Sequence, residues 1–370
     1  MPIGTVASGS YSHPTPTDPL VPPGAVTIET YAQTDVGKTR EHNEDAFVVA
    51  DLATARPIAF DRQRRQRSGP MGTLFMVADG MGGAAAGEYA SAAAVEVVLR
   101  YLRDHWSGRD RPTPETFVVA MYRAAIRAND ELHMIQKERR DLEGMGTTAT
   151  IAGLLGDTLY LAQVGDSRAY LVRDGKAVQI TRDQSLMQRL IDAGEISEEA
   201  AATSDRRNII LQALGPEAHV KIDLTYQRLR RGDVLVVCSD GLSGQVKPEE
   251  IASVVGDGSD LERACDQLVT KANSAGGPDN ITVVAARFVG DGLAAASDDD
   301  DAGYHEFALP SAITLDLEAA GPPPEALPSA TTPVVVDDER RRRGQRWMRI
   351  LAGLGIALAL YVIWRYLRAP

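Results

Sequence analysis

The chain has 370 residues, a hydrophobic content of 44% and a formal net charge of −12. This length fits one large domain with extensions, or two domains, and the hydrophobic content is sufficient for a sizeable core. The mildly acidic balance provides no electrostatic footprint for nucleic acid, so we expect no nucleic-acid partner. Two cysteines, Cys238 and Cys265, are too few for a disulfide framework, and we expect both to be buried thiols in a reducing compartment.

The two ends of the chain differ in composition from its middle. Residues 1–25 are rich in proline, threonine and serine, which predicts a disordered arm and not a signal peptide. Residues 291–339 carry 12 acids and no Lys or Arg, whereas residues 340–370 carry eight Arg and no acid. We therefore expect an acidic, then basic, flexible linker over residues 291–346.

Residues 26–290 alternate between strand-like and helix-like patterns. Apolar spacing predicts long helices over residues 87–105 and 114–138, the second beginning after Thr113, and Ser259 with Glu262 predicts a capping box for a later helix. Predicted strands, rich in Val, Ile, Thr and Tyr, cover residues 46–50, 74–78, 148–154, 158–164, 168–173, 234–238 and 281–288.

Two short turns indicate how these strands pair. Gly156-Asp157 and Asp174-Gly175 each separate two strand-like runs, as in antiparallel hairpins. Hairpins between helix pairs indicate an α+β fold with antiparallel sheets flanked by helices, and not a parallel βαβ fold.

The C-terminal segment combines arginines with an apolar run. Residues 350–364 form 15 apolar positions, and residues 347–367 provide 21, close to the ~20 needed to cross a bilayer if Arg349 and Arg365 reach the interfaces. Six Arg precede the run and two follow it, so the positive-inside rule predicts a single-pass helix with the main domain in the cytosol. The alternatives are a buried core helix, which a 50-residue linker disfavours, and an interfacial helix, which lacks a polar face here.

Acidic residues recur at the ends of the predicted strands. Each alone is an ordinary turn residue, but antiparallel strands can bring such ends together, and gathered carboxylates repel one another unless cations neutralise them. The chain has six His and neither Cys-x-x-Cys nor His-Glu-x-x-His, which disfavours zinc, whereas all-oxygen sites suit Mg²⁺ or Mn²⁺. The residues are Glu44, Asp45, Asp79, Asp166, Asp240 and Asp279.

Six ordered motifs resemble the metal-dependent Ser/Thr protein phosphatases of the PPM (type 2C) class, in their bacterial form. The motifs are REHNED (40–45), ADGMGG (78–83), GMGTT (144–148), VGDSR (164–168), CSDGL (238–242) and GGPDNIT (276–282). The resemblance implies a sandwich of two antiparallel sheets flanked by helix pairs over residues 26–290, with a mobile flap at about 183–215. It also implies hydrolysis of phosphoserine and phosphothreonine proteins by a metal-activated water at a two-ion Mn²⁺ or Mg²⁺ centre.

The resemblance assigns a role to each matching residue. Asp79 would bridge two ions with the Gly80 carbonyl as a further ligand, and Asp240 and Asp279 would complete the first ion. Glu44 and Asp45 would bind or orient waters on the second ion, and Asp166 would be a ligand of an additional ion. Arg40 would hold the substrate phosphate, because its planar fork suits two phosphate oxygens.

Four departures from the family pattern concern the surroundings of this centre. Met81 replaces a His found in animal members, so the proton donor to the leaving group is open. Gln184 stands where His is common, and residues 204–208 replace a His-Pro found in many relatives. Residues 56–69, which include Arg62, Arg64, Arg65 and Arg67, resemble an insertion between two strands. We interpret it as a solvated loop, with docking to an acidic partner or anionic membrane as the alternative.

Other functions compare poorly with this interpretation. Neither cysteine is followed by an Arg at the spacing of a cysteine phosphatase, and no Gly-x-x-x-x-Gly-Lys-Ser/Thr loop supports a kinase or NTPase. A pseudophosphatase that only binds phosphoproteins is the main rival, and a regulator acting on anti-anti-sigma-type proteins would use the same chemistry. A Ser/Thr kinase at the same membrane, with its substrates, is the partner we expect.

Overall fold

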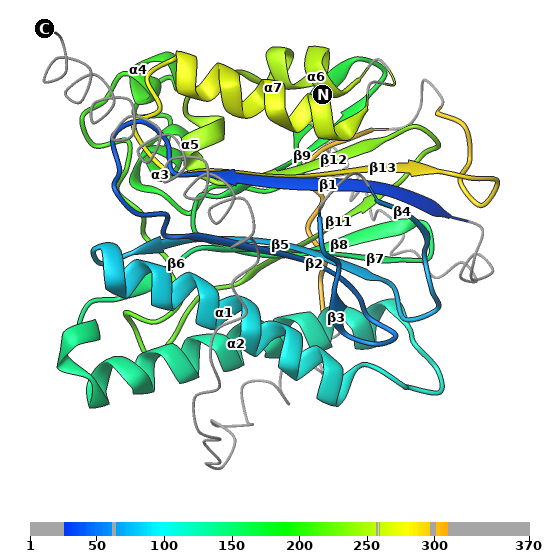
Figure 1. Cartoon of the computed structure of the whole chain (residues 1–370), viewed down its shortest axis with the longest axis horizontal. Helices are drawn as coiled ribbons and strands as arrows, with labels where there is room; N and C mark the ends of the chain where they lie inside the picture. The colour runs from blue at the N-terminus through cyan, green and yellow to red at the C-terminus, as the bar shows by residue number, and fades with distance from the viewer. Residues whose placement is uncertain (1–25, 61–63, 257, 259, 297–300, 310–370) are drawn as a thin grey trace, which may run out of the picture. The chain divides into compact units, whose positions relative to one another are not determined.

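The computed structural model describes residues 26–60, 64–256, 258, 260–296 and 301–309. Within these ranges two antiparallel sheets pack face to face, with helices on both outer faces (Figure 1). The α+β sandwich implied by the resemblance is therefore confirmed.

The sheets hold six and seven strands within the described ranges. The first runs in the order β10 (Lys176–Gln179), β9 (Arg168–Arg173), β12 (Val234–Cys238), β13 (Ile281–Val289), β1 (Thr27–Asp35) and β4 (Arg64–Arg67). The second runs β11 (Asp223–Arg228), β8 (Thr158–Val164), β7 (Ala149–Leu155), β5 (Thr73–Met81), β2 (Asp45–Asp51) and β3 (Arg56–Pro57), with β6 (Gly146–Thr147) beside β5. Both predicted hairpins, β7–β8 and β9–β10, are present.

The interior between the sheets is formed by alternate apolar side chains of the central strands. Phe75 of β5 and Phe288 of β13 meet edge to face at a ring separation of 6.2 Å, and both are fully buried. Because successive side chains of a strand point to opposite faces, the other apolar residues of the same strands pack outward against the helices. The sheets are thus covered on both sides, which explains why β5, β7, β8 and β12 are apolar along most of their length.

An antiparallel helix pair covers the second sheet. Helix α1 (Ala84–His105) and helix α2 (Pro114–Glu138) are cross-linked by Arg100, which donates to Glu131 at 2.6 and 2.7 Å. Helix α2 has the predicted bounds and begins with the Thr113 cap, whose hydroxyl accepts from the Thr116 amide. Helix α1 begins three residues earlier than predicted.

A second helix group covers the first sheet. It consists of α5 (Asp240–Ser243), α6 (Pro248–Val255) and α7 (Leu261–Ser274), and Figure 1 shows α6 and α7 on the outer face opposite α1 and α2. Cys238, at the end of β12, and Cys265, in α7, are buried free thiols in the apolar cluster between the first sheet and these helices, as predicted. The predicted capping box of α7 is wrong: Asp260 caps the helix by accepting from the Arg263 amide, and Ser259 lies outside the described residues. Asp260 lies one residue closer to the helix, within reach of that amide.

The segment predicted as the flap joins β10 to β11 across one end of the sandwich. It contains α3 (Leu186–Asp192) and α4 (Glu198–Ala202). A short 3-10 turn, Arg140–Leu142, lies elsewhere, between α2 and β6. Its two ends pair with each other, because Leu186 donates to the Ile209 carbonyl and Leu211 donates to the Gln184 carbonyl. The segment is thus closed at its base.

Two surface segments differ from the sequence-based expectation. The basic insertion at residues 56–69 is not only a loop: β3 pairs with β2, and β4 extends the first sheet as its edge strand beside β1. An edge strand needs only backbone partners on one side, so its arginines can point to solvent. Arg65 lies 3.2 Å from Glu29 of β1.

The expected linker also begins later than residue 290. Tyr226 and Phe307 donate backbone hydrogen bonds to His305 and Leu224 respectively, which adds residues 305–307 to the edge of β11. Phe307 is 4% exposed and packs edge to face against Tyr160. Apolar burial and β-pairing thus order part of a segment whose acidic composition predicted a linker.

The remaining predicted segments, the arm at residues 1–25, the rest of the linker and the membrane helix at 347–367, lie outside the described residues. Among the described residues, no helix is both long and apolar enough to cross a bilayer.

Candidate active site

Two strands of the second sheet place two carboxylates opposite each other. Asp45 opens β2 and pairs with Asp79 near the end of β5, so their side chains project on the same face of the sheet. Ser239 donates to the Asp45 carboxylate at 2.7 Å. The Asp79 amide donates to the Thr148 hydroxyl, and the Asp79 carbonyl accepts from the Thr148 amide, both at 2.9 Å. These contacts fix both carboxylates at one end of the sandwich.

The first sheet brings two more carboxylates to the same end. Asp240 follows β12 and starts α5, and Asp279 precedes β13, its antiparallel neighbour. Asn280 follows Asp279 and is 4% exposed. Its side-chain oxygen accepts from the Glu44 amide at 2.8 Å, and its side-chain nitrogen donates to the carbonyls of Val36 and His42. Asn280 therefore links the strand ends of both sheets.

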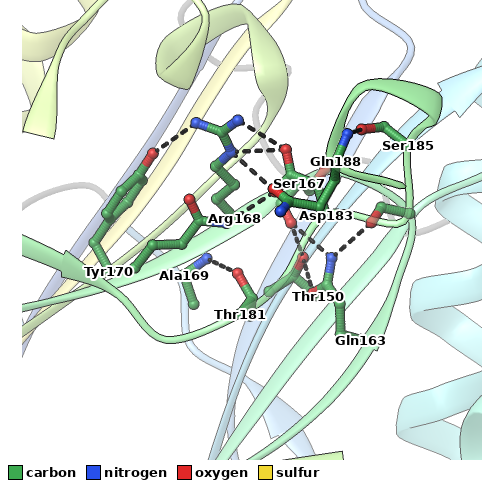
Figure 2. Close-up of polar contacts among 12 residues, drawn as sticks. Thr150, Gln163, Ser167, Arg168, Ala169, Tyr170, Thr181, Asp183, Ser185 and Gln188 are labelled. Atoms are coloured by element: carbon green, nitrogen blue, oxygen red, sulfur yellow. Dashed lines mark hydrogen bonds and ion pairs between the residues drawn. The ribbon is translucent and has the colours of Figure 1, made fainter. Parts of the chain in front are cut away.

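Asp166 occupies the turn between β8 and β9. It is 7% exposed, and its neighbour Ser167 shares a 2.8 Å hydrogen bond with Thr148. Thr150 and the Gln163 side chain both donate to the Ser167 carbonyl, a network that Figure 2 shows. The turn is thus connected through Thr148 to Asp79.

The electrostatics of this cluster agree with a crowded set of carboxylates. Desolvation, and then repulsion by the neighbouring aspartates, raises the pKa of Asp79 well above its ordinary value. Burial is also the main cause that raises the pKa of Asp45 and of Asp166 to about 7 each, and it raises that of Asp240 together with the charge of Asp279. Burial and mutual repulsion thus disfavour the charged forms of these groups, and bound cations would favour them, so the cluster fits cations.

Three unpartnered oxygens support the same interpretation. One carboxylate oxygen each of Asp45, Asp166 and Asp240 is buried without a hydrogen-bond partner. Among the described residues, no three His, Cys, Asp or Glu side chains form a complete ligand set for one ion. An ion here would therefore complete its shell with water and backbone oxygens, as Mg²⁺ commonly does. The donor set, all oxygen, fits Mg²⁺ or Mn²⁺.

A close helix–strand approach positions Glu44 and Gly80. A Cβ on Gly80 would lie 2.2 Å from the Gly87 carbonyl, and one on Gly87 would lie 2.0 Å from Oε2 of Glu44. Ser91 of α1 donates to the Glu44 carbonyl at 2.6 Å. Burial raises the pKa of Glu44. The absence of side chains at both glycines is what allows α1 to approach the carboxylates.

Arg40 brings a cationic group to this cluster. Its guanidinium donates to Asp279 at 2.8 Å, and its side chain is 48% exposed. An exposed guanidinium with free donors beside a carboxylate cluster can bind the oxygens of an anionic ligand. The cysteines take no such position: Cys238 is fully buried, which raises its thiol pKa to about 12 and makes it a poor nucleophile.

The structure thus brings together the residues proposed from the sequence, and adds others that sequence reasoning missed. Ser239, Asn280, Thr148 and Ser91 carry no catalytic chemistry but hold the carboxylates in place. Three of them lie inside the six motifs, and that position was the available signal; Ser91, on an alanine-rich helix, gave none.

Comparison with known proteins establishes the family. The sequence pattern of the family described as "Protein phosphatase 2C" matches residues 61–277. The serine/threonine phosphatase stp of Listeria innocua is 36% identical over 253 residues, which are 68% of this chain and 92% of that protein. The chain belongs to the protein phosphatase 2C family.

Two further similarities extend this result. The serine/threonine protein phosphatase PstP of Mycobacterium tuberculosis is 38% identical over 260 residues, covering 70% of this chain and 44% of PstP. A crystal structure of a PstP catalytic domain in complex with two manganese ions superposes with a TM-score of 0.58 at 34% identity, covering 71% of this chain and 99% of that one. That relative therefore holds two cations within the fold described here.

Proposed function

We propose that the protein hydrolyses phosphoserine and phosphothreonine in proteins, as a metal-dependent phosphoric monoester hydrolase. One observation carries the proposal: five aspartates gather at one end of the sandwich, and three of them, Asp45, Asp166 and Asp240, combine a raised pKa with a buried oxygen that has no hydrogen-bond partner. The other two are Asp79 and Asp279. Family membership and the naming of the relatives as serine/threonine phosphatases support the reaction class.

The chain's own residues divide the work between them. Asp79, with the Gly80 carbonyl, Asp240 and Asp279 would hold one Mn²⁺ or Mg²⁺, Asp79 with Glu44 and Asp45 would hold a second through water, and Asp166 would take part in a third. When bound, two such ions would lower the pKa of a water and neutralise charge on the phosphoryl group. Arg40 would bind two phosphate oxygens and orient the phosphorus for in-line attack. Ser239 and Asn280 would keep the carboxylates aligned.

A direct assay tests the proposed activity. The purified full-length chain is incubated with a phosphothreonine peptide in Mn²⁺, in Mg²⁺ and with chelator, beside Asp79→Asn and Asp240→Asn. We expect metal-dependent phosphate release that both variants lose by at least about 100-fold, since each removes a charge from the cation site. A folded wild-type protein that releases no phosphate with either metal would instead indicate a phosphoprotein-binding pseudophosphatase.

We also propose a single-pass membrane anchor at residues 347–367, with the catalytic domain in the cytosol. The apolar run, its arginine flanks and its aromatic ends support it. Retention of the full chain in the membrane fraction through an alkaline carbonate wash, and its release after deletion of residues 340–370, is the expected result. Release of the intact chain by the wash would contradict an anchor.

A Ser/Thr kinase at the same membrane, together with its substrates, is the partner that we propose for this phosphatase. A phosphatase for phosphoserine and phosphothreonine requires a kinase that makes them, which supports a kinase partner. Comparing phosphoproteomes of cells with and without the protein tests it, and the absence of any change at kinase sites would remove the partnership.

A further inference from the structure

The turn that carries Asp166 is held from two sides. On one side, Thr148, Thr150 and Gln163 bond Ser167, as described above. On the other side lies Gln184, the second residue of the flap. Its backbone amide donates to the Gly165 carbonyl at 2.9 Å, and its side-chain oxygen accepts from the Gly165 amide, also at 2.9 Å. One residue of the flap therefore satisfies both backbone groups of the residue preceding Asp166.

The other half of the Gln184 side chain reaches the segment that leads from the flap to β11. Its amide nitrogen donates to the Lys221 carbonyl at 3.1 Å, just before β11. The Gln184 carbonyl accepts from the Leu211 amide at 2.8 Å. A single amide side chain thus connects three segments: the Asp166 turn, the beginning of the flap and its return to β11.

The position of Gln184 is fixed by the residue before it. Asp183 accepts three hydrogen bonds from Arg168 at 2.7–3.1 Å and one from Gln179 at 2.8 Å, and Arg168 in turn donates to the Tyr170 hydroxyl (Figure 2). Ser185, on the other side, caps α3 by accepting from the Gln188 amide. Hydrogen bonds thus fix both sequence neighbours of Gln184, so its side chain can hold the turn from a fixed position.

The turn depends on such support. Gly165 is buried with φ +95°, and a Cβ there would lie 2.6 Å from the Thr148 side chain, so the turn has little freedom to find another acceptor for its amide. One carboxylate oxygen of Asp166 is buried without a hydrogen-bond partner. The orientation of this side chain therefore depends on the backbone of the turn.

We infer that Gln184 is a positioning residue that holds the turn at residues 165–167, and thereby Asp166, in place against the base of the flap. This rests on the proposed role of Asp166 in cation binding. Gln184 also lines a groove of about 720 Å³ between the flap and residues 304–309, together with Arg189, Leu211 and Tyr304. Its side chain therefore lies between that groove and the Asp166 turn.

Gln184→Met tests the inference, because methionine has similar length but neither accepts nor donates these bonds. In the full-length protein we expect Mn²⁺ titration by calorimetry to show the weakest class of sites about 10-fold weaker, as is typical when the support of a ligand is lost. Hydrogen exchange should become faster in a peptide covering residues 163–168. The KM for Mn²⁺ should rise by more than the kcat for a phosphopeptide falls.

Gln188→Ala is the matched control, since it removes another flap amide, one that donates to Asp192 on the same helix. It should leave Mn²⁺ binding and exchange at residues 163–168 unchanged. Wild-type Mn²⁺ affinity and wild-type exchange in Gln184→Met, or equal changes in both variants, would overturn the inference. Mn²⁺ binding and hydrogen exchange need no turnover, so these two measurements remain decisive if the phosphatase activity itself is not found.

Gln184→Glu covers the case in which Gln184→Met does not fold. It keeps an acceptor for the Gly165 amide and loses the donor to Lys221. We expect exchange at residues 163–168 to stay slow while exchange near residue 221 becomes faster. Fast exchange at residues 163–168 in this variant would overturn the inference.

Discussion

Asp45 and Asp79 lie directly opposite each other across the β2–β5 pair, one at the beginning of its strand and the other near the end. Like charges in this arrangement repel, and here burial and three further aspartates add to the effect. The protein thus accepts a local destabilisation at the place where a cation can relieve it.

The first prediction concerns stability without metal. Asp45→Asn should stabilise the chelated protein at pH 8, by on the order of 2–4 kcal/mol, because it removes a buried charge and keeps an oxygen to accept from Ser239. The same variant should gain less stability than wild type from added Mn²⁺. Urea unfolding with and without Mn²⁺ measures both quantities. A destabilised chelated variant would show that the carboxylate is not under electrostatic strain.

The second prediction concerns pH. The pKa values of Asp45 and Asp166, about 7 in the folded state, exceed the ~3.9 of an exposed Asp. Between these values the folded state binds more protons than the unfolded state, so stability falls as pH rises. The contribution is complete below about pH 4 and is lost as pH passes through about 7.

Thermal unfolding at pH 5.5 and pH 8 measures this effect. We expect the chelated protein to have the lower Tm at pH 8, and Mn²⁺ to raise Tm more at pH 8 than at pH 5.5, because cations bind the ionised carboxylates. Asp45→Asn should show a smaller pH dependence than wild type. A chelated Tm that rises between these two pH values would contradict the assignment.

The third prediction separates Arg40 from a simple positive charge. Arg40→Lys keeps the charge but loses the planar fork, so we expect KM for a phosphothreonine peptide to rise about 10-fold with a smaller change in kcat. Arg65→Lys, on the edge strand beside Glu29, is the control and should match wild type. Equal kinetics for Arg40→Lys and wild type would show that Arg40 does not bind the phosphate as a fork.

The fourth prediction concerns the segment after β13. Phe307 is buried against Tyr160 and Tyr226, so Phe307→Ala should destabilise the protein by about 3–5 kcal/mol. Tyr304→Ala, at a residue 38% exposed in the same segment, should cost less than about 1 kcal/mol. Urea unfolding of both variants in excess Mn²⁺ tests the claim. Similar stabilities for the two would show that residues 301–309 do not belong to the folded domain.

The sequence predicted local elements better than pairings between distant segments. Helix α2 and strands β8, β9 and β12 have the predicted bounds, because strong apolar patterns and short turns define them. The edge strand β4 has the sequence RRQR and forms only because β1 offers it backbone partners. Residues 305–307 join β11 for the same reason, although an acidic run precedes them in the chain.

The candidate site shows the same difference between local patterns, which the sequence predicts, and contacts between distant segments, which it does not. The carboxylates were recognisable because their motifs combine acids with strand ends and glycines. The contacts that hold them could not be predicted, even where the residue lies in a motif: Asn280 links Glu44, Val36 and His42 across about 240 positions of sequence. Gln184 likewise reaches Gly165 and Lys221 from the flap. Such bonds depend on tertiary structure, and amide side chains carry no chemical signal of their own.

The last prediction concerns a glycine whose role is steric. Gly241 follows Asp240, and a Cβ there would lie 1.9 Å from the backbone carbonyl oxygen of Asn280. Because a backbone atom cannot move aside as a flexible side chain can, Gly241→Ala must push α5 away from the start of β13, and with it Asp240 from Asp279. We expect a loss of at least about 2 kcal/mol in stability and a loss of Mn²⁺ affinity. Gly303→Ala is the matched control, since a Cβ there meets nothing within 4 Å and its stability should be unchanged. A Gly241→Ala protein with wild-type stability and wild-type Mn²⁺ binding would show that the distance between the two aspartates does not depend on this contact.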